Sequence, residues 1–240
     1  MTTRELWVFL HGTPLTPEVW RPIAERVRAR GALVSSPSLD ARGDAATHAA
    51  RIGGQLPKNA MVTVVGHSFG GQVAIDLALI LGGENRLAGL GVVCSRATPY
   101  LPFEATAGLL REGKRPDPEA AIARWFTPDE RHVGSPIIDY AKRRLCEADP
   151  EVWADALASI ARYDRETELA NISAPTLLVA AEQDLVSPPE VMESMAASMP
   201  TSRFHVLGAT SHMGAFLRTD ITSALLLDGL TGAGRTEAAG

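Results

Sequence analysis

The hydrophobic positions of this chain fall into short continuous runs, and helix-compatible sequence separates most of them. Several of these runs are rich in β-branched residues and are four or five residues long, which is typical of strands. Strands that are apolar at consecutive positions indicate a sheet covered on both faces, as in mostly parallel sheets with crossover helices. We therefore predict an α/β fold with a mostly parallel sheet of about six strands, at residues 6–10, 32–35, 61–65, 90–94, 176–180 and 203–207.

The alternation of strands and helices stops between about residues 100 and 165. No strand pattern occurs there, and the apolar residues recur at helical spacing. We expect this segment, 100–165, to be a helical cap inserted into an α/β core made of residues 1–99 and 166–230. The final segment, 231–240, is small, polar and contains glycine, so we expect a disordered tail.

The third predicted strand leads directly into a candidate nucleophile. Residues 66–70 read Gly-His-Ser-Phe-Gly, and a mostly apolar helical pattern follows at once. Gly-x-Ser-x-Gly between a strand and a helix is the form of a nucleophile elbow. The sharp turn strains the serine backbone and leaves no room for side chains two positions away, a need that Gly66 and Gly70 meet. Without its flanking strand and helix the motif also fits an ordinary glycine-rich turn, so this context is what predicts Ser68 as a nucleophile.

A serine hydroxyl is a weak nucleophile unless a base and an orienting acid accompany it. On folds with this elbow the chain order is serine, acid, histidine. Asp184 follows the fifth predicted strand and His212 follows the sixth, so both lie in loops beyond strand ends, on the side where Ser68 lies. Position therefore favours His212 over the other histidines as the general base. Glu182 is a second acid candidate, but we interpret it as a loop residue or a hydrogen-bond acceptor at a strand end.

Stabilising an oxyanion requires backbone amides that point at one place. The amide of Phe69, at the start of the helix after the serine, is one candidate. Residues 11–14, His-Gly-Thr-Pro, follow the first predicted strand, and the amide of Thr13 is the second candidate. Pro14 has no amide hydrogen and cannot serve. The same turn also fits a simple strand end, so its assignment depends on the elbow.

Composition excludes several other classes of function. A chain of 240 residues with 45% hydrophobic content can form one substantial core. The net charge of -5 comes from interspersed acids and bases, which argues against a nucleic-acid partner. No long hydrophobic stretch occurs and the chain begins close to its first strand, so we expect a cytoplasmic protein with no membrane partner. Cys94 and Cys146 have no metal-ligand spacing, so we expect reduced thiols and neither metal nor cofactor. The pattern does not specify an oligomeric state.

Together these residues resemble the α/β-hydrolase superfamily over nearly the whole chain. Three segments are further similar to 3-oxoadipate enol-lactonases and related small bacterial esterases. The resemblance implies that Ser68, Asp184 and His212 form a catalytic triad and that the amides of Thr13 and Phe69 form the oxyanion hole. The similar segments are residues 124–128 (Arg-Trp-Phe-Thr-Pro), 148–151 (Ala-Asp-Pro-Glu) and 174–180 (Ala-Pro-Thr-Leu-Leu-Val-Ala).

The chain also departs from that family pattern. Few residues precede the first strand, so we expect six strands where relatives usually have eight. The loop at residues 40–45 lacks the usual Gly-x-Ser continuation. Leu217 stands where relatives commonly carry a glutamate. These differences leave the expected chemistry intact and leave the substrate open.

The expected activity is hydrolysis of a small-molecule carboxylic ester or lactone through an acyl-enzyme, with an enol-lactone as one case. Thioesterase or perhydrolase activity, a non-hydrolytic biosynthetic reaction and a ligand-receptor role on the same fold remain alternatives. Substrate recognition is expected in the cap. Aromatic residues there also fit a plain helical core, and arginines also fit a solvated surface. The candidate substrate-binding residues are Trp125, Phe126, Trp153, Tyr100 and Arg124, with Tyr163, Arg96 and Arg143 as further possibilities.

Overall fold

The computed structural model describes residues 5–231, and it contains a single six-stranded sheet within that range. The strand order is β2-β1-β3-β4-β5-β6, and every neighbouring pair runs parallel, which confirms the predicted α/β architecture. The predicted tail, apart from Thr231, lies outside the described residues. The strands are β1 (Glu5–Leu10), β2 (Leu33–Ser35), β3 (Met61–His67), β4 (Leu87–Val93), β5 (Thr176–Ala181) and β6 (Ser202–Leu207).

The fourth strand begins three residues earlier than its apolar pattern indicates. β4 starts at Leu87, whereas the predicted strand starts at Leu90. The early part contains Gly89, which has no side chain to contribute to the pattern. The added part pairs with β3, where Leu87 lies opposite Val62 and Gly89 lies opposite Thr63. Pairing with β3 therefore extends the strand beyond its predicted start.

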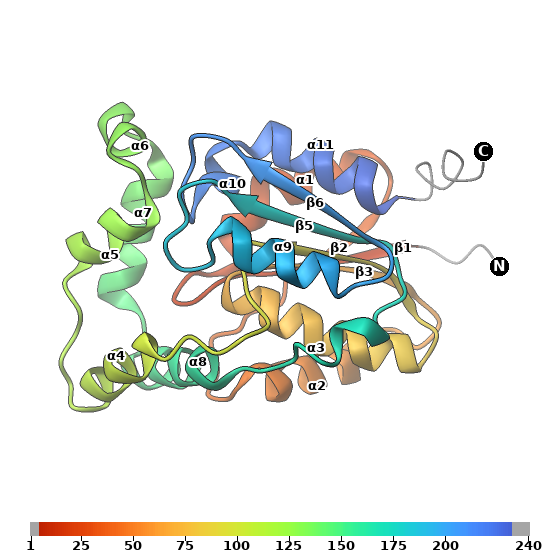
Figure 1. Cartoon of the computed structure of the whole chain (residues 1–240), viewed down its shortest axis with the longest axis horizontal. Coiled ribbons are helices and arrows are strands. Elements are labelled where there is room, and N and C mark those ends of the chain that lie inside the picture. The colour runs from red at the N-terminus through yellow and green to blue at the C-terminus, as the bar shows by residue number, and fades with distance from the viewer. Residues whose placement is uncertain (1–4, 232–240) are drawn as a thin grey trace.

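Helices cover both faces of the sheet. α1 (Arg21–Ala29) packs with α11 (Thr219–Leu230) on one face, and α2 (Ala45–Gln55) packs with α3 (Phe69–Gly83) on the other (Figure 1). α3 lies between the sheet, α2 and a helix of the cap, which explains why it is apolar on almost every side. The remaining core elements are the short helices η1 (Pro17–Trp20), η2 (Leu169–Asn171) and α10 (Gly214–Leu217), and α9 (Pro189–Ala197) beside β5 and β6.

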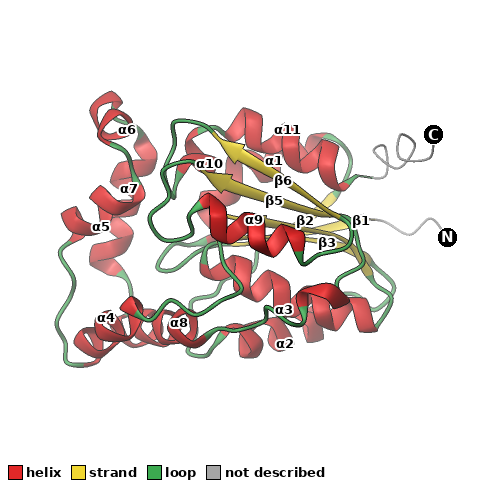
Figure 2. Ribbon diagram, in the orientation of Figure 1, coloured by secondary structure: helices red, strands yellow, loops and turns green. Residues whose placement is uncertain are grey.

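Five α-helices lie between β4 and β5, all within the range predicted for the cap. Figure 2 shows them gathered beyond the arrowheads of the strands, at the left of the view. Each begins with a proline in its first turn, where a missing amide hydrogen breaks no helical hydrogen bond. They are α4 (Pro102–Arg111), α5 (Pro118–Trp125), α6 (Pro128–Val133), α7 (Pro136–Glu147) and α8 (Pro150–Arg162).

The order of the strands determines where a site can form. The chain leaves β1 toward β2 on one side and returns as β3 on the other side of β1. Loops that follow β1 and β3 therefore diverge to opposite faces and leave a crevice at the carboxyl ends of these strands. The cap lies over this end of the sheet (Figure 1). Across residues 5–231, no helix is both long enough and apolar enough to cross a bilayer.

Candidate active site

The turn between β3 and α3 has the strained geometry of a nucleophile elbow. Ser68 has φ 54° and ψ -123°, a left-handed φ that non-glycine residues rarely adopt. A Cβ at Gly66 would lie 2.0 Å from the carbonyl oxygen of Gly70, and a Cβ at Gly70 would lie 2.2 Å from that of Leu10. Neither position can carry a side chain, because no Cβ approaches an oxygen so closely. The two glycines therefore allow α3 to begin directly above β1 and β3, with Ser68 at the apex.

Neighbouring groups hold the strained serine backbone in place. The Ser68 amide donates to the carbonyl oxygen of Val93 at 3.0 Å, and the Ser68 carbonyl accepts from the Ser95 hydroxyl at 2.7 Å and from the Gly71 amide at 2.8 Å. A Cβ at Gly71 would lie 2.4 Å from the Cβ of Ser95, so the helix start and the loop after β4 are in close contact. Ser95 is a supporting residue that the sequence analysis missed. The paired glycines after Phe69 were the available signal for such a contact.

Asp184 and His212 form a buried hydrogen-bonded pair. His212 Nδ1 lies 2.8 Å from Asp184 Oδ2, and the other carboxylate oxygen accepts from the amides of Val186 at 2.8 Å and Ser187 at 3.1 Å. Burial by itself would raise the pKa of Asp184, but the His212 imidazole and these two amides outweigh it and lower that pKa. An ionised carboxylate only accepts hydrogen bonds, so His212 Nδ1 carries the proton and Nε2 is left with a lone pair.

Glu182, the other acid candidate, has a different partner. Its Oε2 accepts a hydrogen bond from the amide of Ala209 at 2.7 Å. The Glu182 amide itself donates to the carbonyl oxygen of Leu207 at 3.0 Å. Glu182 therefore joins the ends of β5 and β6, in agreement with its interpretation as an acceptor at a strand end.

The loop that carries His212 is tied to both the core and the cap. The Ser211 hydroxyl lies within hydrogen-bond distance of the carbonyl oxygen of Gln183 at 3.1 Å, next to Asp184 in the chain. The Met213 amide donates to the carbonyl oxygen of Trp125, at the end of α5, at 3.1 Å. The two residues that flank His212 are thus attached to different parts of the molecule, and these attachments restrict the loop.

The turn after β1 approaches the serine closely. A Cβ at Gly12 would lie 3.0 Å from the Cβ of Ser68, so the turn packs tightly against the elbow. The His11 imidazole is buried and spans this turn, since Nδ1 lies 2.9 Å from the Gly12 carbonyl oxygen and Nε2 accepts from the Leu39 amide at 3.0 Å. Burial lowers the pKa of His11 to about 4, which keeps the ring neutral. The turn that contains Thr13 is therefore held next to the elbow.

Two adjoining cavities lie under the cap. The smaller, about 60 Å³, is lined by both Ser68 and His212, so the structure brings the predicted nucleophile and base to one space. The larger, about 250 Å³, is lined by Phe69 and Arg144. Thr13 and Trp153 line both. The rest of the smaller cavity is formed mainly by cap residues Phe103, Thr106, Pro116, Ala121, Arg124, Trp125, Leu157 and Ile160, with Val186 from the core.

Three of the five principal substrate-binding candidates, Arg124, Trp125 and Trp153, line the smaller cavity. Neither Phe126 nor Tyr100 is among the described residues that line it. Phe126 follows the last residue of α5 and is 1% exposed, so its ring is in the core. Tyr100 packs edge-on against Phe103, with ring centroids 4.8 Å apart, and Phe103 occupies the cavity wall instead.

Helical spacing would have identified several of the lining residues that sequence analysis missed. Trp153, Leu157 and Ile160 are four and three residues apart on α8 and therefore lie on one face of the helix. Phe103 and Thr106 have the same relation on α4. The spacing does not predict whether such a face lines the cavity or packs inside the cap, because both places accept apolar side chains.

The other candidate arginines have structural contacts outside the cavity. Arg96 donates to the carbonyl oxygens of Val186 at 2.9 Å and Thr98 at 3.0 Å, and it supports the loop that contains Asp184. The guanidinium of Arg143 lies over the ring of Tyr140, 5.7 Å from its centroid.

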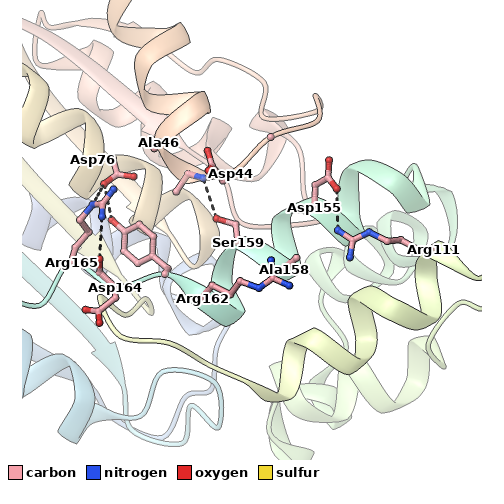
Figure 3. A pocket seen from close by; sticks show the side chains of 13 residues that line it. Asp44, Ala46, Asp76, Arg111, Asp155, Ala158, Ser159, Arg162, Asp164 and Arg165 are labelled. Atoms are coloured by element: carbon pink, nitrogen blue, oxygen red, sulfur yellow. Dashed lines mark hydrogen bonds and ion pairs between the residues drawn. The ribbon is translucent and has the colours of Figure 1, made fainter.

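A separate polar cleft of about 420 Å³ lies between the cap helix α8 and the core helices α2 and α3. Figure 3 shows ion pairs among its charged groups, of Asp76 with Arg165 and of Asp155 with Arg111. Tyr163 joins this network through its hydroxyl, which donates to the carbonyl oxygen of Gln72 at 3.0 Å. The Asp155–Arg111 pair joins two cap helices, α8 and α4. The contacts that Arg165 and Tyr163 make with α3 attach the end of the cap to the core. Tyr163 is therefore placed here and not in the cavity beside Ser68.

Comparison with curated proteins gives two distant relatives. The chain is 25% identical over 232 residues to the biotin biosynthesis bifunctional protein BioHC of Cellvibrio japonicus, an alignment covering 88% of this chain and 44% of that protein. It is 29% identical over 134 residues to 3-oxoadipate enol-lactonase 2 of Acinetobacter baylyi, covering 55% of this chain and 49% of that protein. The chain thus spans about half the length of the curated relatives it matches.

Solved structures show the same fold. An esterase from Thermogutta terrifontis superposes with a TM-score of 0.81 at 24% identity, covering 94% of this chain and 89% of that one. The enol-lactonase from Burkholderia xenovorans superposes with a TM-score of 0.83 at 20% identity, covering 95% and 92%. The model of the alpha/beta hydrolase family matches residues 7–222, which include the elbow, the cap and the loops of Asp184 and His212. The chain belongs to the alpha/beta hydrolase family.

Proposed function

We propose that this protein hydrolyses a carboxylic ester or lactone of a small molecule through an acyl-enzyme formed on Ser68. The observation that carries the proposal is the buried His212–Asp184 pair, whose imidazole lines the same cavity as a serine in strained elbow geometry. Such an arrangement supplies a nucleophile, a base and a group that orients the base. The enol-lactonase and esterase named above support this class of reaction.

The proposed reaction has two steps. Ser68 Oγ attacks the substrate carbonyl carbon while His212 Nε2 accepts the hydroxyl proton, and Asp184 stabilises the imidazolium that forms. The amides of Thr13 and Phe69 donate hydrogen bonds to the developing oxyanion. Collapse of the tetrahedral intermediate breaks the ester bond, and His212 returns the proton to the leaving oxygen. Water then attacks the acyl-enzyme with His212 again as the base, which releases the acid and restores Ser68.

The lining of the smaller cavity indicates the kind of substrate. Most of its side chains are apolar, and among the described lining residues Arg124 is the one arginine, lysine, aspartate or glutamate. A compact apolar substrate with one acidic group would pair that group with the guanidinium. This pairing favours a lactone that carries a carboxylate, as in an enol-lactone acid. Neutral esters would use only the apolar wall.

Labelling with a fluorophosphonate tests the nucleophile. The wild-type protein should be labelled and Ser68→Ala should not, whereas Ser194→Ala, which changes an exposed serine on α9, should be labelled at the wild-type rate. Esterase and lactonase activity that persists in Ser68→Ala would exclude the acyl-enzyme proposal.

A substrate panel tests the reaction class. Neutral esters, carboxylate-bearing lactones and thioesters of matched size should be compared in wild type and in Arg124→Met. The lactone proposal expects Arg124→Met to lower kcat/KM for the carboxylate-bearing lactone and to leave neutral esters almost unchanged. Preferred cleavage of thioesters would instead assign the protein as a thioesterase.

A further inference from the structure

His67 is the residue before the nucleophile, and the proposed reaction gives it no role. Its side chain is 1% exposed and does not line either cavity beside Ser68 within the described part of the chain. Its ring instead packs against the ring of His212, with centroids 4.9 Å apart at 51°. The Phe216 ring also packs against it in a T-shaped arrangement, with centroids 4.8 Å apart at 68°. The His67 imidazole is therefore enclosed directly behind the proposed base.

One nitrogen of His67 is bonded to the backbone of His212. His67 Nε2 lies 2.9 Å from the carbonyl oxygen of His212. A carbonyl oxygen only accepts, so Nε2 carries the proton. Burial lowers the pKa of His67 to about 3, and the ring is therefore neutral, with a lone pair on Nδ1. This bond holds the main chain of His212, whereas the Ser211 and Met213 contacts hold the residues on either side of it.

The other nitrogen of His67 faces the turn that approaches Ser68. Nδ1 has no hydrogen-bond partner among residues 5–231, and a Cβ at Gly12 would lie 2.9 Å from it. The ring thus fills the space between the loop of His212 and the turn of residues 11–14. Because close-packed groups transmit small displacements, a change in this ring would move both.

We propose that His67 is a positioning residue, which holds the main chain of His212 through its Nε2–H and sets the spacing between that loop and the Gly12 turn. The inference rests on the proposed function, since it assumes that His212 must be aligned with Ser68. A displacement of about 1 Å in a catalytic group can reduce turnover on the order of 100-fold. A buried donor bonded to the backbone of the base is placed to prevent such a displacement.

Glutamine and phenylalanine at position 67 separate positioning from packing. Glutamine places an amide N–H near the position of imidazole Nε2 and can donate to the same carbonyl. Phenylalanine keeps a ring of similar shape but donates no hydrogen bond. Asparagine is shorter, so its amide matches Nδ1 rather than Nε2. His132→Phe is the matched control, because His132 is an exposed histidine on α6.

The experiment measures kcat and KM for p-nitrophenyl acetate, and the rate of fluorophosphonate labelling, on the full chain. His67→Phe should lower kcat about 10-fold to 100-fold and leave KM within about 2-fold, because Ser68 and the cavity walls remain. His67→Gln should recover most of the lost kcat, and His132→Phe should behave as wild type. If His67→Phe does not fold, His67→Gln should still exceed His67→Asn in kcat by about 10-fold.

Two results would overturn the inference. One is a His67→Phe protein with wild-type kcat. The other is a His67→Gln protein whose kcat is no higher than that of His67→Phe or, if that variant does not fold, of His67→Asn. A different result would exclude the proposed function itself, namely a Ser68→Ala protein that retains the activity and labelling of the wild type. A protein that reacts through Ser68 but is indifferent to position 67 keeps the proposed function and loses only this inference.

Discussion

The elbow and the cap form opposite walls of the same cavity, but different forces specify them. At the elbow, the backbone makes contacts so close that residues 66 and 70 can only be glycine. In the cap, proline starts and apolar stripes define each helix, and no comparable contact restricts Gly108 on α4, where a Cβ would meet nothing within 4 Å. The elbow is therefore defined by steric exclusion between strand, turn and helix, while the cap is defined by packing of side chains.

Because of this difference, the residues proposed to react and the residues expected to select the substrate belong to different regions. The groups proposed to react lie on or beside the rigid sheet, at the switch point between β1 and β3. The residues that shape the cavity come mainly from α4, α5 and α8, which can change without disturbing the elbow. Substitutions near the elbow should thus alter turnover or folding, and substitutions in the cap should alter the choice of substrate.

The largest effect is expected for Asp184→Asn. An amide in place of the carboxylate no longer favours a proton on His212 Nδ1, so Nε2 would lose its lone pair. We expect kcat to fall about 10,000-fold, measured on the best substrate of the panel. Glu182→Gln, a matched change in the same loop, should retain nearly full activity because Glu182 bonds to the Ala209 amide. Equal losses in both variants would contradict the assignment of Asp184.

Replacing one glycine in each region by alanine compares how tightly the elbow and the cap are packed. Gly70→Ala would place a Cβ 2.2 Å from the Leu10 carbonyl oxygen, and we expect it to lower the free energy of unfolding by about 3 kcal/mol. Gly108→Ala has open space on a helix and should raise that free energy by about 0.5 to 1 kcal/mol. Urea denaturation of both variants tests this prediction. A Gly70→Ala protein with wild-type stability would show that steric exclusion does not define the elbow.

Acid should destabilise the elbow more than the cap. The pKa values of His11 and His67 are lowered by burial to about 4 and about 3, against 6.5 for the free side chain. Below pH 6.5 the unfolded chain therefore binds protons that the folded chain excludes. Each of the two histidines should lower the free energy of unfolding by about 1.4 kcal/mol per pH unit until its folded pKa is reached.

Denaturant unfolding at pH 7 and pH 5 measures this slope. His67→Gln should reduce it, because one of the buried histidines with a lowered pKa is gone. His132→Gln, on the exposed α6 of the cap, should leave it unchanged. A slope that does not respond to position 67 would show that the buried imidazole is not excluded from protonation.

The smallest effect is expected for Leu157→Ala in the cap. Leu157 lines the smaller cavity from α8, and its removal enlarges the space for the substrate. We expect the ratio of kcat/KM for an ester longer by two carbons to that for the shorter ester to rise about 10-fold. The rate of fluorophosphonate labelling should change little, since the elbow is intact. A labelling rate that falls with the selectivity would contradict the separation of the two regions.

The fold could be predicted from the sequence because its strands carry a local signal. All six strands have a β-rich apolar run, and only the start of β4, around Gly89, lacked one. The elbow was equally local, since five consecutive residues contain both the serine and the glycines that make room for it. Asp184 and His212 were accessible by their place after β5 and β6, because parallel strands bring their carboxyl ends to one edge.

The sequence did not predict which cap side chains point into the cavity. An apolar residue on a helix has the same pattern whether it faces the cavity, as Phe103 on α4 does, or the protein core, as Leu110 on the same helix does. The supporting contacts of Ser95 and His67 were hidden for a related reason, since each joins segments that are distant in the chain. Hydrophobic periodicity carries no information about a partner in a distant segment of the chain.

The sequence alone determined the α/β sheet, the inserted helices and the strained serine turn, because hydrophobic period, proline and glycine act within a few residues of where they occur. Only the tertiary structure decided which cap residues line the cavity, which groups hold the serine and His212 in place, and how the cap is attached to the core. Those features depend on distances between remote segments, and such distances are set when the whole core packs.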